Sequence, residues 1–63
     1  MIDLVLKIEK YSGRLYGQIN LEGDALILDS ADTEIKLMAK IKRQLEIYCR
    51  LNENDYTLRK DYI

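Results

Sequence analysis

Residues 30–51 read SADTEIKLMAKIKRQLEIYCRL, and this stretch decides the fold. Ser30, Asp32 and Thr33 are residue types that cap helix N-termini, and the sequence leaves open which of them is the cap. At 100° per residue the apolar side chains that follow gather on one stripe, with no proline or glycine to interrupt it. The stripe consists of Leu37, Met38, Ile41, Leu45, Tyr48 and Cys49. The stretch therefore predicts one long amphipathic helix that another element must cover.

Alternating apolar and polar residues precede this helix. Residues 2–9 (IDLVLKIE) and 15–22 (LYGQINLE) have the period of two that is typical of half-buried strands. A connection of hairpin length that contains Gly13 joins them, and Gly17 indicates a bulge or a close backbone approach. After a turn at 22–24, residues 25–29 (ALILD) predict a short third strand.

After the helix, residues 52–55 (NEND) predict a turn in which either asparagine takes the left-handed position, and residues 56–63 (YTLRKDYI) predict a last strand. We expect a single α+β domain over residues 1–63, with the order β-β-β-α-β and one helix on one face of a small antiparallel sheet. The strand residues expected to face the helix are Ile2, Leu4, Leu6, Ile8, Leu15, Ile19, Leu21, Leu26, Leu28 and Leu58.

Composition limits how such a chain is stabilised. Its 63 residues include one cysteine, Cys49, and no histidine, which excludes an internal disulfide and a structural zinc site. Small domains without either usually rely on oligomerisation, so we expect a homo-oligomer. There is no signal-peptide pattern and no apolar run of about 20 residues, and a lone thiol suits a reducing compartment, so we expect a cytoplasmic protein without membrane contact.

No residue pattern predicts an enzyme, a metal site or a cofactor. Cys49 lies late in the helix beside the apolar stripe, where it is expected to fill the core. The carboxylates Asp24, Asp29 and Asp32 do not have the spacing of a calcium-binding loop, and the glycines are too scattered to form a phosphate-binding loop.

The sheet face turned away from the helix is the candidate protein interface. The predicted alternation places the apolar residues Val5, Tyr16 and Ile27 there, and no second layer would cover them. Gln18 and Asp29 complete the candidate set. The last strand also leaves a free sheet edge, which invites strand pairing between chains.

An alternative interface lies on the basic side of the helix, at Lys36, Lys40, Arg43 and Arg50. These side chains could meet nucleic acid or an acidic partner. The net charge of −1 and the pI of about 5.3 favour a solvated face over a nucleic-acid surface.

Three short segments resemble the N-terminal domain of HicB-like antitoxins: residues 8–13 (IEKYSG), 15–17 (LYG) and 31–33 (ADT). The chain departs from that family in having no proline, where members usually carry a proline-containing loop, and no DNA-binding segment up to Ile63. Operator binding is therefore not implied. The resemblance implies a partial HicB-like fold, self-association and the capping of a basic toxin that cleaves RNA.

Overall fold

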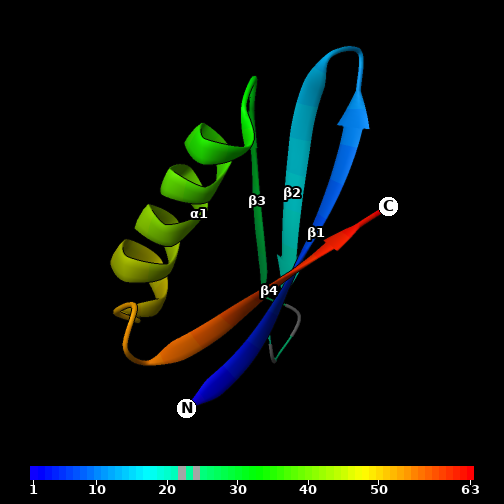
Figure 1. The fold of residues 1–63 in the computed structure, drawn as a ribbon. Helices are drawn as coiled ribbons and strands as arrows, with labels where there is room; N and C mark the ends of the chain where they lie inside the picture. Colours follow the sequence, from blue (N-terminus) through cyan, green and yellow to red (C-terminus); the bar gives the residue numbers. More distant parts are fainter. Residues whose placement is uncertain (22, 24) are drawn as a thin grey trace.

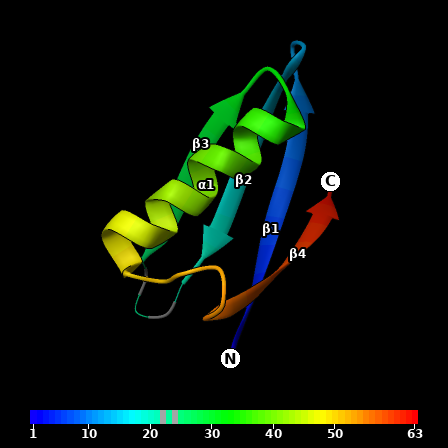
Figure 2. The ribbon, with the colours of Figure 1, turned by 60° about the vertical axis from the view of Figure 1, so that its left-hand side comes forward.

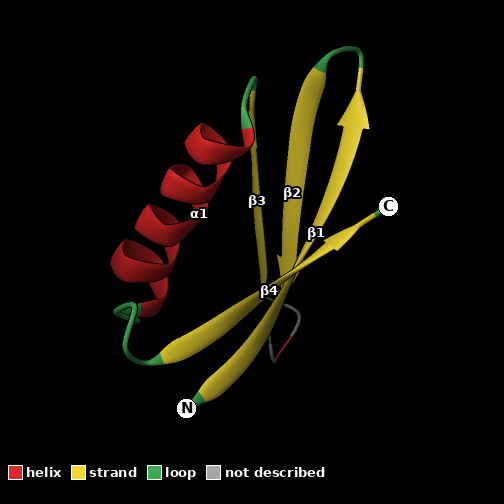
Figure 3. Cartoon of the chain, viewed as in Figure 1, coloured by secondary structure: helices red, strands yellow, loops and turns green. Residues whose placement is uncertain are grey.

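A computed structural model describes residues 1–21, 23 and 25–63. The predicted turn at 22–24 and the carboxylate of Asp24 lie partly or wholly outside this description. The elements are β1 (Ile2–Tyr11), β2 (Arg14–Asn20), β3 (Leu26–Ala31), α1 (Glu34–Cys49) and β4 (Tyr56–Tyr62). Figure 1 shows the helix on one face of a four-stranded sheet, and Figure 3 shows the same view by secondary structure, which confirms the α+β class.

The strand order is β3-β2-β1-β4, and the sheet is mixed rather than wholly antiparallel. The pairs β1–β2 and β2–β3 are antiparallel, whereas β4 runs parallel to β1. The reason lies in the single helix between β3 and β4. It carries the chain back along the sheet, so β4 starts at the same end as β3 and runs in the same direction. Figure 2 shows α1 over β3 and β2, with β4 at the other edge of the sheet, beyond β1.

The first hairpin is closed by Ser12 and Gly13, whose φ angles are 52° and 75°. Two consecutive positive φ angles are those of a type I′ turn, whose twist matches that of the strands beside it. Tyr11 pairs with Arg14 across this two-residue loop, which sets the register of β1 and β2.

The helix begins after Thr33, whose hydroxyl accepts a hydrogen bond from the backbone N–H of Lys36 at 3.3 Å. At the other end the left-handed residue is Arg50, with φ of 54°, and not either asparagine as the sequence had suggested. Leu51 donates its N–H to the carbonyl of Leu45 at 3.0 Å and packs on the core. An apolar contact of this kind commonly accompanies a left-handed residue at a helix C-terminus, and together they explain why the helix ends at Cys49.

The core lies between α1 and the sheet. Its fully buried side chains are Leu6, Ile8, Ile19, Leu37, Ile41 and Leu45. Each contributes roughly 1.5–3 kcal/mol through burial. Tyr48 was expected in this stripe but is 76% exposed, because the C-terminal end of α1 diverges from β3 (Figure 1). Ile2 was also expected inside and is 47% exposed, at the free end of β1.

Gly17 lies beneath the helix, where side chains of β1 and α1 leave little room for a Cβ atom. A Cβ atom placed on it would lie 3.1 Å from Leu6 Cδ1 and 3.2 Å from Leu37 Cδ1. The sequence predicted a bulge or a close backbone approach, whereas the atoms near Gly17 belong to side chains of β1 and α1. A larger residue at this position would push the helix away from β2.

Candidate functional site

The sheet face turned away from α1, here called the outer face, has no second layer within the described part of the chain (Figure 1). Tyr16, Leu26 and Leu28 lie on it with 43%, 48% and 57% of their surface exposed. Val5 and Gln18 are half-buried on the same face. Three of the predicted interface residues, Val5, Tyr16 and Gln18, are thus brought together as expected.

The prediction for the third strand was wrong in its phase. Ile27 is 4% exposed and lies in the core, whereas Leu26 and Leu28 point to the outer face. The register explains this, because Ile27 lies opposite the buried Ile19 and must share its side of the sheet. Three consecutive apolar residues fit either phase, so the alternation carried no signal here. Ala31, four residues after Ile27, is buried on the same side of the strand, in agreement with this register.

The outer face combines this apolar cluster with balanced charges. Gln18 of β2 lies opposite Leu28 on one side and Lys7 on the other, and a shallow hollow forms around them. The charged residues of the face are Asp3, Glu9 and Asp61 against Lys7, Arg14 and Arg59. Because the charges balance, the apolar side chains distinguish this surface from an ordinary solvated one.

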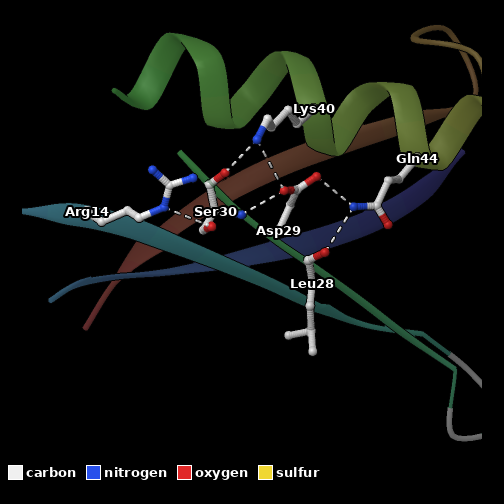
Figure 4. A network of polar contacts seen from close by, with 6 residues as sticks. All are labelled: Arg14, Leu28, Asp29, Ser30, Lys40 and Gln44. Atoms are coloured by element: carbon white, nitrogen blue, oxygen red, sulfur yellow. Dashed lines mark hydrogen bonds and ion pairs between the residues drawn. The ribbon is translucent and has the colours of Figure 1, made fainter. Parts of the chain in front are cut away.

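Asp29, the fifth predicted interface residue, lies on the helix side of β3 and not on the outer face (Figure 4). Its Oδ2 accepts a hydrogen bond of 2.8 Å from Gln44 Nε2, and its Oδ1 lies 3.7 Å from Lys40 Nζ. Oδ1 also accepts the backbone N–H of Ser30 at 2.8 Å. The same register that buries Ile27 turns Asp29 toward the helix, where it joins β3 to α1.

The backbone at the β3 edge is covered by the same network (Figure 4). Gln44 Nε2 donates to the carbonyl of Leu28 at 2.9 Å, and Lys40 Nζ donates to the carbonyl of Ser30 at 3.0 Å. Both carbonyls point away from β2. Side chains of α1 therefore occupy positions that a strand of another chain would need, which protects this edge from strand addition.

These contacts also set the charge state of Asp29. Partial burial acts to raise the pKa of the carboxyl, but the Ser30 N–H, the Gln44 amide and Lys40 together hold that pKa below its ordinary value of 3.8. The carboxylate is thus ionised throughout the neutral range and serves as a fixed acceptor.

The predicted basic face of the helix is partly neutralised. Lys36 lies 3.3 Å from Asp32 Oδ1, and Lys40 is held at the β3 edge by Asp29. Arg43 borders the groove on the other side of the helix, and Arg50 follows the last helical residue. Among the residues that the structure describes, two of the four cations, Lys36 and Lys40, are thus paired with carboxylates, and no ion pair is formed by Arg43 or Arg50.

A groove that the sequence did not indicate runs between α1 and β4. Met38, Leu51 and Tyr56 are among its apolar lining residues. Ion pairs border it, with Lys42 Nζ 3.5 Å from Glu53 Oε1 and Lys60 Nζ 3.1 Å from Glu34 Oε1. It exists because α1 packs over β3 and β2 and leaves β4 less covered (Figure 2).

Two tyrosines of β4 differ in their surroundings, because Tyr56 lines this groove and Tyr62 contacts Glu34 at one end of it. Burial raises the pKa of the Tyr56 hydroxyl, and Glu53 and Glu46 act in the same direction. Tyr62 donates a hydrogen bond to Glu34, and this bond together with Lys60 lowers the pKa of the Glu34 carboxyl. The contact joins the end of β4 to the first turn of the helix.

Within residues 1–21, 23 and 25–63, no group of three or more histidine, cysteine, aspartate or glutamate side chains is placed to hold a metal ion. Cys49 is partly buried against the core. No helix in the described part of the chain is long and apolar enough to cross a membrane. Comparison of the chain with protein-family models, curated proteins and solved structures finds no match.

Proposed function

We propose that this chain is a small protein-binding module, an antitoxin similar to the HicB-like family or an orphan inhibitor, which acts as a homo-oligomer and occludes the surface of a partner protein. The observation that carries the proposal is the outer face, where Tyr16, Leu26 and Leu28 are exposed together. Burial of such side chains stabilises a complex by about 25 cal/mol per Å² of apolar surface removed from water. Tyrosine suits such a contact because it offers a large area with a polar tip.

The resemblance at residues 8–13, 15–17 and 31–33 supports a basic ribonuclease toxin as the class of partner. Residues 1–33 contain three basic and six acidic residues, a net charge of −3, which agrees with a basic partner. The outer face itself has balanced charge, so binding there would depend mainly on the apolar side chains and would be only moderately sensitive to salt.

The experiment is affinity capture from the native host with wild-type protein and the double variant Leu26→Ser/Leu28→Ser. A matched control is Ile47→Ser, which changes an apolar residue that is 55% exposed on the helix. We expect wild type and Ile47→Ser to retain one basic protein that the double variant loses. The purified partner should cleave RNA, and added chain should stop the cleavage.

Equal retention by all three proteins would contradict a role for the outer face. A captured partner without ribonuclease activity would overturn the assignment of the partner as a toxin, but the proposed role of the outer face in binding would stand. Circular dichroism of each variant establishes that the fold is unchanged.

A further inference from the structure

The two edges of the sheet differ in whether side chains of α1 cover their backbone groups. The β3 edge is covered by Gln44, Lys40 and Asp29, as described above. The β4 edge lies on the side that α1 does not cover (Figure 2). The contrast between a protected and an unprotected edge indicates where strand pairing between chains can occur.

The hydrogen bonds between β1 and β4 show which backbone groups of β4 are free. Ile2 donates its N–H to the carbonyl of Asp55, and Ile63 donates its N–H to the carbonyl of Ile8. Odd-numbered residues of β4 therefore bond to β1, and the even-numbered ones point outward because the direction alternates along a strand. The outward residues are Tyr56, Leu58, Lys60 and Tyr62. Among the residues that the structure describes, none bonds to these outward groups.

We propose that β4 pairs antiparallel with β4 of a second copy of this chain, around a two-fold axis at Lys60. The proposal rests on the homo-oligomer part of the proposed function and is independent of the partner-binding part. Pairing of the two β4 strands joins two four-stranded sheets into one continuous sheet, with both helices on the same face of it.

Charge decides the register. With the axis at Lys60, Arg59 lies opposite Asp61 of the second copy, twice by symmetry, and Leu58 lies opposite Tyr62. An axis at Arg59 would oppose two arginines, and one at Leu58 would oppose Asp55 to Asp61. Opposite charges in facing positions stabilise a sheet, and like charges destabilise it.

The Arg59–Asp61 pair also occupies the closer type of site. Because the outward backbone groups belong to even-numbered residues, these two odd-numbered residues form a non-hydrogen-bonded pair, in which the side chains approach most closely. Arg59 and Asp61 have no ion-pair partner within the described part of their own chain. Both are therefore available to the second copy.

The remaining pairs are compatible with this register. The axis brings the two Lys60 side chains together, but each lies 3.1 Å from Glu34 of its own chain, which offsets the repulsion. Leu58 and Tyr62 face the helix side, where they extend the apolar lining near Tyr56. The pairing uses residues 57–63, so the connection at 50–55 lies outside it.

The test is a pair of charge variants, Arg59→Asp and Asp61→Arg, measured by sedimentation of the full chain. The wild-type chain has a monomer mass of 7.4 kDa and is expected to sediment as a dimer. Each variant alone places like charges opposite each other twice, so we expect its association to weaken about tenfold or more. A one-to-one mixture of the two variants restores both pairs and is expected to restore the dimer.

Arg43→Asp is the matched control, since it changes the net charge by the same amount on the helix, and it is expected to remain dimeric. A monomeric wild type at high concentration would overturn the proposal. So would variants that stay dimeric alone, or a mixture that remains monomeric while both variants keep the wild-type circular dichroism. Failure of partner capture with an intact dimer would overturn only the partner-binding proposal.

Discussion

Gln44 of α1 and Asp29 of β3 are joined by a hydrogen bond of 2.8 Å between Nε2 and Oδ2. The same Nε2 atom donates to the carbonyl of Leu28 at 2.9 Å. One side chain thus anchors the helix to the sheet and covers a backbone acceptor at the sheet edge. It couples the stability of the domain to its resistance to unwanted strand pairing.

Gln44→Ala should therefore have two effects. Loss of the bonds is expected to lower the free energy of unfolding by roughly 1 kcal/mol, measured by urea titration. Exposure of the Leu28 carbonyl is expected to speed aggregation at elevated temperature, measured by light scattering. Gln44→Glu should be worse, because a carboxylate cannot donate and would face Asp29. Arg43→Ala, one residue away, should change neither quantity.

Gly17→Ala tests the tight contact beneath the helix. The added Cβ would lie 3.1–3.3 Å from Leu6 and Leu37, so the variant is expected to lose about 1–3 kcal/mol of stability. The loss should shrink when Leu37→Ala is present, because the new methyl group then fills part of the space that leucine leaves. Additive losses in the double variant would show that the two residues do not compete for this space.

Much of the fold follows from pattern alone. The helix between Thr33 and Cys49, the first hairpin and the inward face of β1 were all indicated by period and by turn residues. These elements have one interpretation each, because a shift of a single residue would expose a row of apolar side chains.

The parts that could not be predicted depend on contacts between distant residues. The phase of β3 was ambiguous because Leu26, Ile27 and Leu28 are all apolar, and only the pairing of Ile27 with Ile19 decides it. Asp29 looked like a surface charge, and its role depends on Lys40 and Gln44, which lie more than ten residues away along the chain. The groove beside β4 depends on where the helix sits across the sheet, which the hydrophobic period does not specify.

The phase of β3 can be tested by comparing Ile27→Ala with Leu28→Ala. Ile27 is 4% exposed and Leu28 is 57% exposed, so the first variant should lose about 2–5 kcal/mol and the second no more than about 0.5 kcal/mol. In a domain of this size the first loss can unfold the protein, and the midpoint of thermal unfolding measured by circular dichroism would report it. Similar losses in both variants, or the reverse order, would contradict the observed phase.

The pH dependence of stability should carry a contribution from Asp29. Its folded pKa lies below the ordinary value of 3.8, so the unfolded chain takes up the proton first as the pH falls. The contribution is therefore complete above about pH 5 and is lost as the pH falls through 3.8 and then through the lower folded pKa.

Asp29→Asn should lower stability at pH 7 and flatten the decline in acid, as measured by urea titrations between pH 7 and pH 2. Glu9→Gln removes one negative charge on the outer face and serves as the control for net charge. If stability fell equally steeply with falling pH in Asp29→Asn and in Glu9→Gln, the network around Asp29 would not be lowering the pKa of its carboxyl.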